Sequence, residues 1–579
     1  MSYAQIIFDL PLDGPFDYAI PRDLSQKVKE GSRVWVFLGA RRLVGYVYAI
    51  AKTSSVKNTK PITSLIDDKP IAGSENFLIA EFLSDYYGCS LGQALAIQFP
   101  EQVRNGKQFH FPKSTFIQSE IAGNKGILLH WECPDSKWDF FTEQINSALK
   151  NGLKAIFIAA DKFMLEQVKT RLSPKINNEK NFTVGTRSQV FTRLEPLGLI
   201  IVDQDENFAH KQEQSPHYHT REVAIMRSNL TNSQLIIASR SPSLESWKMA
   251  KDKLLKYIKL SSKLNKEIKI INPRNPLQTH EAILAALTRK EKVLLVLNRS
   301  GFATQAYCHN CGFCMTCPRC NVKLILHHPD NMLRCHYCNF KQEAVSICPK
   351  CQSGYIKYSG TGTEKLESEM ARIFPQAKVV CIKKDTVFDQ EKADIFISTE
   401  SVLSLPIRFK NVFAMAIDFS LNYPDFRAAE KTYGLLCGLL DLTNYRLYIQ
   451  TTLPQHHVIR AILEQDPAIF YDEELKQRDQ AKLPPYLHLG ILRIRGKNET
   501  RVKETAEEFF KLLNSENSVD SKVEVAAIAP SIPPKKRGSY HFQILLKAKK
   551  PQDIVKFIKT RLQNYKHSGI MLVLDIDPI

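Results

Sequence analysis

Four Cys-x-x-Cys pairs lie close together between Cys308 and Cys351, and they constrain the fold of this chain more than any other feature. They read CHNC, CPRC, CHYC and CPKC. One pair places two thiolates on one edge of a metal ion and a second pair supplies the other edge, so the pattern predicts two tetrahedral Zn²⁺ sites. A disulfide framework is the alternative. The chain opens MSYAQIIFDL, without a charged and then apolar leader, which favours the reducing cytoplasm, where thiols persist.

The spacing of the four pairs predicts how they share the two metal ions. Residues 321–334, NVKLILHHPDNMLR, combine an apolar run, a turn and a short return, which is typical of a β-hairpin. Folding this hairpin brings the middle pairs together as an inner site with the ligands Cys317, Cys320, Cys335 and Cys338. The outer pairs then close a nested second site with the ligands Cys308, Cys311, Cys348 and Cys351. Cys314 is left as a spare thiol, and two closed sites of this kind hold shape rather than activate water.

The composition indicates a soluble, multidomain protein with a polyanionic partner. At 579 residues the chain can form three or more domains. It has no run of about eighteen apolar residues, so we expect no membrane partner. The formal net charge of +19 favours nucleic acid, because each phosphate that Lys or Arg neutralises releases a counterion. An RNA-binding or transcription protein with a zinc ribbon would share this charge.

Hydrophobic patterning predicts small domains at both ends of the chain. Residues 4–21 and 32–51 alternate short apolar runs with turns, as β-strands do, and residues 75–99 carry a helical period. From residue 483 onward, alternating strands and two helices describe an α+β domain.

Several motifs along the chain resemble the PriA family of replication restart proteins (primosomal protein N′). They are PFDY at 15–18, LGARRLVG at 38–45, GTGTEKLE at 360–367, LNYPDFRAAEKTY at 421–433 and LDIDPI at 574–579. The resemblance implies a multidomain α/β protein whose winged-helix domain is deleted around residues 101–119. It implies a β-rich 3′-end DNA-binding domain (1–107), two degenerate RecA-like helicase lobes (108–290 and 291–483), a zinc-binding insertion (305–356) and a C-terminal α+β DNA-binding domain (484–579).

In that family the N-terminal domain captures the 3′ end of a nascent DNA strand. The positions that match its pocket are Phe16, Asp17, Gly39 and Lys60. An aromatic ring can stack on a base, a carboxylate can accept a hydrogen bond from a sugar hydroxyl, glycine allows close approach, and lysine attracts phosphate. The alternative is that Phe16 is only a core residue and Asp17 only a turn residue.

The nucleotide motifs that the resemblance implies have decayed. A phosphate-binding loop needs glycines, a lysine and a hydroxyl, but after the strand at 126–130 only Lys137 remains, and Trp138 occupies the hydroxyl position. Asp203 could still hold a metal ion through water. Gln204 replaces the glutamate that polarises the attacking water, and residues 437–442 contain no arginine. We therefore expect no ATP cofactor and no catalytic residue.

Two further segments are candidates for DNA contact. Residues 208–221, FAHKQEQSPHYHTR, interleave aromatic and basic side chains, as a single-strand track does, although a metal site or a plain solvated loop is the alternative. The candidates in this loop are Lys211, Tyr218, His219 and Arg221. The turn at 533–543 resembles the family's basic turn, and its candidates are Lys535, Lys536, Arg537 and Tyr540.

The sequence thus predicts a cytoplasmic, helicase-derived scaffold that binds stalled or abandoned DNA replication forks. We expect it to promote primosome assembly and loading of the replicative helicase without ATPase activity of its own. The expected partners are forked and single-stranded DNA, other primosome proteins and single-strand-binding protein. The alternative function is an active ATP-dependent 3′-5′ DNA helicase of superfamily 2.

Overall fold

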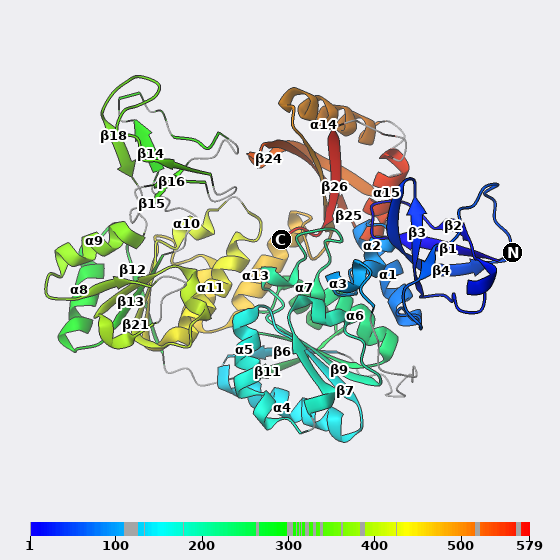
Figure 1. The fold of residues 1–579 in the computed structure, drawn as a ribbon. Coiled ribbons are helices and arrows are strands. Elements are labelled where there is room, and N and C mark those ends of the chain that lie inside the picture. Colours follow the sequence, from blue (N-terminus) through cyan, green and yellow to red (C-terminus); the bar gives the residue numbers. More distant parts are fainter. Residues whose placement is uncertain are drawn as a thin grey trace.

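The described residues of the chain form five β-sheets with their covering helices, four of them in sequence order and the fifth inserted within the third (Figure 1). This computed structural model describes residues 2–108, 126–132, 134–177, 179–261, 266–297, 305–308, 310–311, 313, 315–318, 324–327, 332–335, 340–359, 363–382, 388–423, 425–515, 522–562, 565 and 569–579. The predicted fold class, a multidomain α/β protein with a Cys-rich insertion, is confirmed. Within the described residues, no helix is both long and apolar enough to cross a membrane.

The N-terminal sheet is antiparallel, with the strand order β2-β1-β4-β3-β5. Its apolar face forms a small core of its own. The helix α2 packs against β1 and is capped by Ser90, whose hydroxyl accepts a hydrogen bond from the backbone N–H of Gln93. The elements are β1 (Tyr3–Phe8), β2 (Phe16–Ala19), β3 (Arg33–Leu38), β4 (Arg41–Ala51), β5 (Ser64–Leu65), α1 (Ser74–Tyr87), α2 (Leu91–Ala96) and α3 (Glu101–Arg104).

The second sheet, in lobe 1, is wholly parallel, with the order β11-β6-β10-β9-β7-β8. Strands β6 and β9 are buried along their full length, as expected where helices cover both faces of a parallel sheet. The strands are β6 (Ile127–Trp131), β7 (Lys154–Ile158), β8 (Phe182–Gly185), β9 (Leu197–Asp203), β10 (Gln234–Ser239) and β11 (Lys256–Leu260). The helices are α4 (Pro134–Lys150), α5 (Lys162–Arg171), α6 (Thr220–Thr231) and α7 (Leu244–Lys251).

The third sheet, in lobe 2, is also parallel, with the order β12-β22-β21-β13-β20-β19. Its strands are β12 (Glu267–Ile271), β13 (Val293–Leu297), β19 (Val379–Cys381), β20 (Ile395–Ser398), β21 (Phe409–Met415) and β22 (Thr443–Gln450). The helices are α8 (Pro276–Thr288), α9 (Thr363–Ile373), α10 (Asp418–Leu421), α11 (Ala428–Leu442), α12 (His457–Glu464) and α13 (Pro467–Gln480). The two parallel sheets lie on either side of a central cleft (Figure 1).

A small antiparallel sheet interrupts lobe 2 between β13 and α9 and stands away from it (Figure 1). The predicted hairpin is present, because β15 pairs antiparallel with β16. Strand β14 pairs with β18, which brings the two ends of the insertion together. The strands are β14 (Gln305–Cys308), β15 (Ile325–His327), β16 (Met332–Arg334), β17 (Lys341–Glu343) and β18 (Ile356–Ser359).

The C-terminal sheet is antiparallel, with the order β24-β25-β23-β26. Its strands are β23 (His488–Gly496), β24 (Val523–Lys536), β25 (Ser539–Ala548) and β26 (Ile570–Ile576), and its helices are α14 (Glu499–Leu513) and α15 (Pro551–Leu562). Helix α15 packs against α1, and α1 also packs against α6. One continuous hydrophobic cluster therefore joins the N-terminal helices, lobe 1 and the C-terminal sheet.

Candidate nucleotide site, zinc module and DNA-end pocket

The connection between β6 and α4 is too short to cradle a phosphate group. Strand β6 ends at Trp131 and α4 begins at Pro134, so only residues 132 and 133 separate them. A phosphate-binding loop needs several consecutive backbone N–H groups that converge on one anion. Asp135 also lies in the first turn of α4, where it places a negative charge at the end of the helix that attracts anions.

The side chain of Lys137 is already engaged inside lobe 1. Its Nζ lies 2.9 Å from Oδ2 of Asp203, and the two side chains are 2% and 0% exposed. The ammonium group also lies over two aromatic rings, 4.3 Å from the centroid of Trp131 and 4.8 Å from that of Trp138. The lysine and the aspartate, which the sequence offered as remnants of phosphate and metal binding, therefore neutralise each other.

The acidic residues that follow β9 are also satisfied internally. Oδ2 of Asp205 accepts hydrogen bonds from the hydroxyls of Ser243 and Ser246, both at 2.5 Å. Ser239 Oγ donates to Glu206 at 2.6 Å, and burial raises the pKa of Glu206 well above its usual range. Gln204 adopts a left-handed φ of 58° and donates its backbone N–H to the carbonyl of Ala238. Among the described residues we see no carboxylate in this segment held ready for a water molecule or a metal ion.

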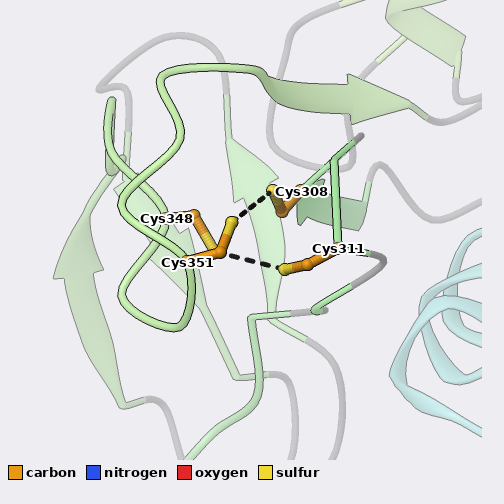
Figure 2. Close-up of side chains that lie close together, drawn as sticks. All are labelled: Cys308, Cys311, Cys348 and Cys351. Atoms are coloured by element: carbon orange, nitrogen blue, oxygen red, sulfur yellow. Dashed lines mark hydrogen bonds between the residues drawn. The ribbon is translucent and has the colours of Figure 1, made fainter.

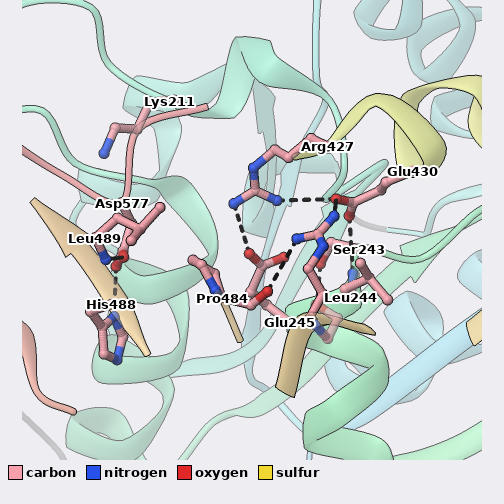
Figure 3. A network of polar contacts seen from close by, with 12 residues as sticks. Lys211, Ser243, Leu244, Glu245, Arg427, Glu430, Pro484, His488, Leu489 and Asp577 are labelled. Atoms are coloured by element: carbon pink, nitrogen blue, oxygen red, sulfur yellow. Dashed lines mark hydrogen bonds and ion pairs between the residues drawn. The ribbon is translucent and has the colours of Figure 1, made fainter. Parts of the chain in front are cut away.

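The two lobes are joined by ion pairs across their cleft. Arg240 of lobe 1 lies 3.1 Å from Asp441 of lobe 2. Asp441 belongs to the segment 437–442, which the sequence predicted to have lost the interface arginines. In the structure this segment of lobe 2 supplies the carboxylate and lobe 1 supplies the arginine. Arg427 of lobe 2 contacts Glu245 at 2.8 Å and Glu430 at 3.1 Å (Figure 3).

The cleft itself is large, with a volume of about 2280 Å³. Lys137, Glu206, Arg240, Arg427 and Asp441 all line it. Space for a nucleotide is therefore present, but Lys137, Arg240 and Arg427 are each held in an ion pair, and Glu206 accepts a hydrogen bond from Ser239.

The four candidate residues in the loop predicted to form a single-strand track are instead buried, which corrects the sequence prediction for them. The four candidates Lys211, Tyr218, His219 and Arg221 are 8%, 2%, 7% and 7% exposed. Side chains this deeply buried offer almost no surface to a DNA strand.

Each of these four residues has a partner inside the protein. Lys211 Nζ contacts Oδ1 of Asp575 at 3.3 Å and lies over the ring of Tyr87. The backbone N–H of His219 donates to the hydroxyl of Tyr87, and Arg221 lies 3.3 Å from Asp205. Tyr218 makes an edge contact with Phe191. Residues 208–221 therefore join lobe 1 to α1 and to the C-terminal strand β26.

The C-terminal segment supplies polar residues to this junction that the sequence reasoning did not identify. Asp577 accepts a hydrogen bond from Tyr86 at 3.0 Å and lies 2.8 Å from Nδ1 of His488 (Figure 3). Burial alone would lower the pKa of His488, but the Asp577 carboxylate raises it above its ordinary value. The motif LDIDPI at 574–579 was the available signal, because it contains two carboxylates beside apolar strand residues.

The outer cysteines come together in the zinc module as a tetrahedral ligand set (Figure 2). Their four sulfur atoms all lie within 4.8 Å of one another. Two of the separations are 3.5 Å, from Cys308 to Cys351, and 3.7 Å, from Cys311 to Cys348. Zn–S bonds of about 2.3 Å in a tetrahedron place sulfurs about 3.8 Å apart, so the residues fit a zinc ion.

The inner site is described only in part. Cys317 and Cys335 are buried in a small core with Met315, Leu324 and Leu333. Cys320 and Cys338, and also Cys314, lie outside the described residues. Because two of its four ligands are not described, the inner zinc site stays a prediction.

The four residues predicted to form a DNA-end pocket near the N-terminus come from three segments of the N-terminal domain. Strand β2 supplies Phe16 and Asp17, the turn between β3 and β4 supplies Gly39, and the loop after β4 supplies Lys60. Lys60 Nζ donates to the carbonyl oxygen of Gly39 at 2.7 Å, and Oδ2 of Asp17 accepts from Ser54 Oγ at 2.6 Å. Gly39 has a φ of 62°, a left-handed conformation that explains the glycine.

Phe16 serves the core and the pocket together. It is half-buried, and its ring centroid lies 5.8 Å from that of Phe8 in the N-terminal core. Asp17 is also half-buried, whereas Lys60 is exposed. The Lys60 side chain is therefore accessible to solvent, and the Asp17 carboxylate is partly accessible.

The basic turn of the C-terminal domain faces the zinc module. Lys535 Nζ donates to the carbonyl of Pro318 at 3.2 Å and lies over the ring of Tyr540 at 4.8 Å. Lys536 and Arg537 are exposed at the tip of the β24–β25 hairpin. The turn therefore carries positive charge and also contacts the insertion.

Three family profiles match parts of the chain. The PriA 3′DNA-binding domain matches residues 5–100, the PriA DNA helicase Cys-rich region domain matches residues 317–342, and the primosomal protein N C-terminal domain matches residues 479–579. These segments coincide with the DNA-end pocket, the inner cysteines and the C-terminal sheet.

Similar proteins extend the match to the whole chain. The replication restart protein PriA of Treponema pallidum is 24% identical, over 100% of this chain and 99% of its own length. That of Rickettsia conorii is 25% identical, also over 100% and 99%. The Bacillus subtilis protein is 26% identical over 79% of this chain and 64% of its own length.

Likeness to solved structures is weaker. S. cerevisiae Dbp5 bound to RNA and ADP BeF3 is 9% identical, with a TM-score of 0.32, and covers 62% of this chain and 89% of its own.

Proposed function

Because this chain belongs to the PriA family, we propose that it binds abandoned or stalled DNA replication forks and promotes primosome assembly and replicative helicase loading. In this proposal it does so without hydrolysing ATP. A role in replication restart is supported by the names of its full-length relatives and by the three matched domains. The remaining partners, other primosome proteins and single-strand-binding protein, and a cytoplasmic location belong to the same proposal.

DNA binding rests on two accessible regions. The N-terminal pocket, with Phe16, Asp17, Gly39 and Lys60, matches a domain described as a 3′DNA-binding domain. The C-terminal turn presents Lys536 and Arg537 to solvent, and the chain has a net charge of +19. We propose these two regions as the DNA contacts, together with Lys535 and Tyr540 beside the turn. We also propose that the 3′-end DNA-binding domain, the two lobes and the C-terminal domain span residues 1–107, 108–290, 291–483 and 484–579.

The buried ion pair between Lys137 and Asp203 is the observation that carries the absence of ATPase activity. A nucleotide and its Mg²⁺ would have to separate this pair, and leaving one buried charge without its partner typically costs about 3–5 kcal/mol. The short β6–α4 connection offers few backbone N–H groups in return. The lobes then act as a scaffold that holds the DNA-binding regions.

The proposal is tested by nucleotide binding and turnover. Calorimetry with ATP and Mg²⁺ should show no binding, with or without forked DNA, and forked DNA should not stimulate phosphate release. Binding of the same fork, measured by fluorescence anisotropy, should be strong and should decrease with salt concentration.

The alternative, an active ATP-dependent 3′-5′ helicase, predicts the opposite result. Fork-stimulated turnover that Lys137→Ala abolishes, and that the exposed control Lys150→Ala retains, would establish the helicase and remove the scaffold proposal. A preference for structured RNA over forked DNA would favour the zinc-ribbon RNA-binding class instead.

We also propose two Zn²⁺ ions per chain, each with four cysteine ligands. The geometry of the outer cluster supports zinc binding. Mass spectrometry of the native protein should return two zinc ions per chain. Cys308→Ser should remove the outer ion, and because the outer site closes over the inner hairpin, it should also weaken the inner one. A single zinc ion in the unaltered protein would contradict the nested arrangement.

A further inference from the structure

The loop that joins β4 to β5, residues 52–63, carries Lys60 of the predicted DNA-end pocket and is fixed to the N-terminal sheet by several backbone hydrogen bonds. The backbone N–H of Ala19 donates to the carbonyl of Lys60 at 2.9 Å, and the N–H of Ile62 donates to the carbonyl of Ala19 at 3.0 Å. The N–H of Thr63 donates to the backbone carbonyl of Trp35 at 2.8 Å. The C-terminal half of this loop is thus held beside β2, the strand that carries Asp17.

One side chain near the start of this loop contacts the pocket carboxylate directly. Ser54 Oγ donates to Oδ2 of Asp17 at 2.6 Å. The same oxygen accepts a hydrogen bond from the backbone N–H of Val56 at 3.1 Å. Ser54 is half-buried, whereas its neighbour Ser55 is exposed.

These two contacts orient the serine hydroxyl. A serine has one hydroxyl hydrogen, and its oxygen can accept at the same time. Because the Val56 N–H fixes the oxygen from one side, the hydrogen is directed at Asp17. A hydrogen bond to a carboxylate is short and is about twice as strong as a neutral one, which agrees with the 2.6 Å separation.

Holding one oxygen of Asp17 decides what the other can do. The terminal torsion of an aspartate is broad and roughly two-fold, so an untethered carboxylate presents either oxygen in many orientations. With Oδ2 held by Ser54, Oδ1 has a fixed position. Within the described residues Oδ1 makes no hydrogen bond, so it is available to accept one from a ligand hydroxyl.

We propose that Ser54 is a positioning residue that sets the selectivity of the pocket for a free 3′-hydroxyl. This inference rests on the proposed function, in which Asp17 reads the 3′ end of a nascent strand. A 3′-hydroxyl can donate to Oδ1, whereas a 3′-phosphate brings negative charge against the carboxylate. Ser54 fixes the geometry that makes this difference large.

The test compares forks whose nascent strand ends in a 3′-hydroxyl, a 3′-phosphate or a 3′-deoxy sugar. Dissociation constants are measured by fluorescence anisotropy with the full chain, and the readout is the dissociation constant for the 3′-deoxy fork divided by that for the 3′-hydroxyl fork. Ser54→Ala should reduce this ratio by about three- to tenfold, the range expected for one hydrogen bond. Ser54→Thr, which keeps the hydroxyl, should restore it, and Ser55→Ala is the matched control and should leave it unchanged.

A structural role for Ser54 predicts a different pattern. If the serine only stabilises the loop, Ser54→Ala weakens binding to all three forks equally and the ratio stays constant. A constant ratio, or a higher one, in Ser54→Ala would overturn the inference while the unaltered protein still discriminates the ends. If the unaltered protein shows no discrimination, the proposed reading of the 3′ end by Asp17 fails first.

Discussion

The nucleotide region of lobe 1 and the N-terminal pocket both contain a lysine and an aspartate, but the two regions use them in opposite ways. In lobe 1, Lys137 and Asp203 lie 2.9 Å apart and are almost fully buried. In the pocket, Asp17 is held by the hydroxyl of Ser54 and Lys60 by the carbonyl of Gly39. In the first case each charge cancels the other, and in the second both charges are held by neutral partners.

This difference separates a structural ion pair from the site that we propose binds a DNA end. A charge that is neutralised inside the protein has little left to offer a ligand, and separating it from its partner is costly. A charge oriented by a neutral group keeps its full field and faces a smaller penalty when a ligand approaches. The presence of a lysine and an aspartate therefore does not by itself show whether their charges are available to a ligand.

The largest effect should come from breaking the buried pair. Lys137→Met leaves Asp203 without its partner, so the free energy of unfolding should fall by about 3–5 kcal/mol. Urea unfolding followed by tryptophan fluorescence reports on this region, because Trp131, Trp138 and Trp247 all lie in lobe 1.

Two further variants control this experiment. Lys150→Met changes an exposed lysine at the end of the same helix, and should alter the free energy of unfolding by less than about 0.5 kcal/mol. Adding Asp203→Asn to Lys137→Met should recover part of the loss, because no buried charge then remains. An equal, small effect for Lys137→Met and Lys150→Met would show that the pair is not a structural lock.

A smaller effect should appear on acidification, and it should appear in lobe 1 rather than in the pocket. Burial beside Arg240 and Lys259 lowers the pKa of His130 to about 3. Because the unfolded chain binds this proton near pH 6.5 and the folded chain does not, stability falls as the pH drops from about 6.5 toward 3. At about pH 5 this one histidine lowers the free energy of unfolding by about 2 kcal/mol.

The stability of lobe 1 and the preference for 3′-hydroxyl ends can both be measured on the same protein over this pH range. His130→Gln should reduce the loss of stability between about pH 6.5 and pH 5 by about that amount, again measured by tryptophan fluorescence. Residues 1–107 contain no histidine, so the preference for 3′-hydroxyl ends should change little over the same interval. Loss of the end preference before lobe 1 loosens would contradict this division.

The smallest effects should come from the two pocket residues, and they should differ in kind. Lys60→Ala should weaken binding to every DNA and reduce the slope of log affinity against log salt by about one, because one phosphate contact is lost. Asp17→Ala should leave this slope nearly intact and remove the preference for an exposed nascent 3′-hydroxyl end. Equal ratios of 3′-hydroxyl to 3′-phosphate affinity in Asp17→Ala and the unaltered protein would show that the pocket does not read the end.

The sequence by itself determined the features that depend on neighbouring residues. The hairpin between the inner cysteine pairs followed from an apolar run and a turn, and β15 pairs with β16 as expected. The strand expected at 126–130 is also present as β6 (Ile127–Trp131). The sequence also predicted the loss of the phosphate loop, because the missing glycines and hydroxyl can be seen within one short segment.

The tertiary structure alone decided which charged groups meet. Lys137 and Asp203 are 66 residues apart, and Arg240 and Asp441 are 201 apart. The sequence could show that each residue was present but not that each would be neutralised. The aromatic and basic loop at 208–221 has the composition of a DNA track, yet the packing of α1 and β26 buries its candidate residues Lys211 and His219. Composition and period reflect local geometry, whereas burial and pairing depend on which distant segments pack together, and that packing decides whether a charge is left for a ligand.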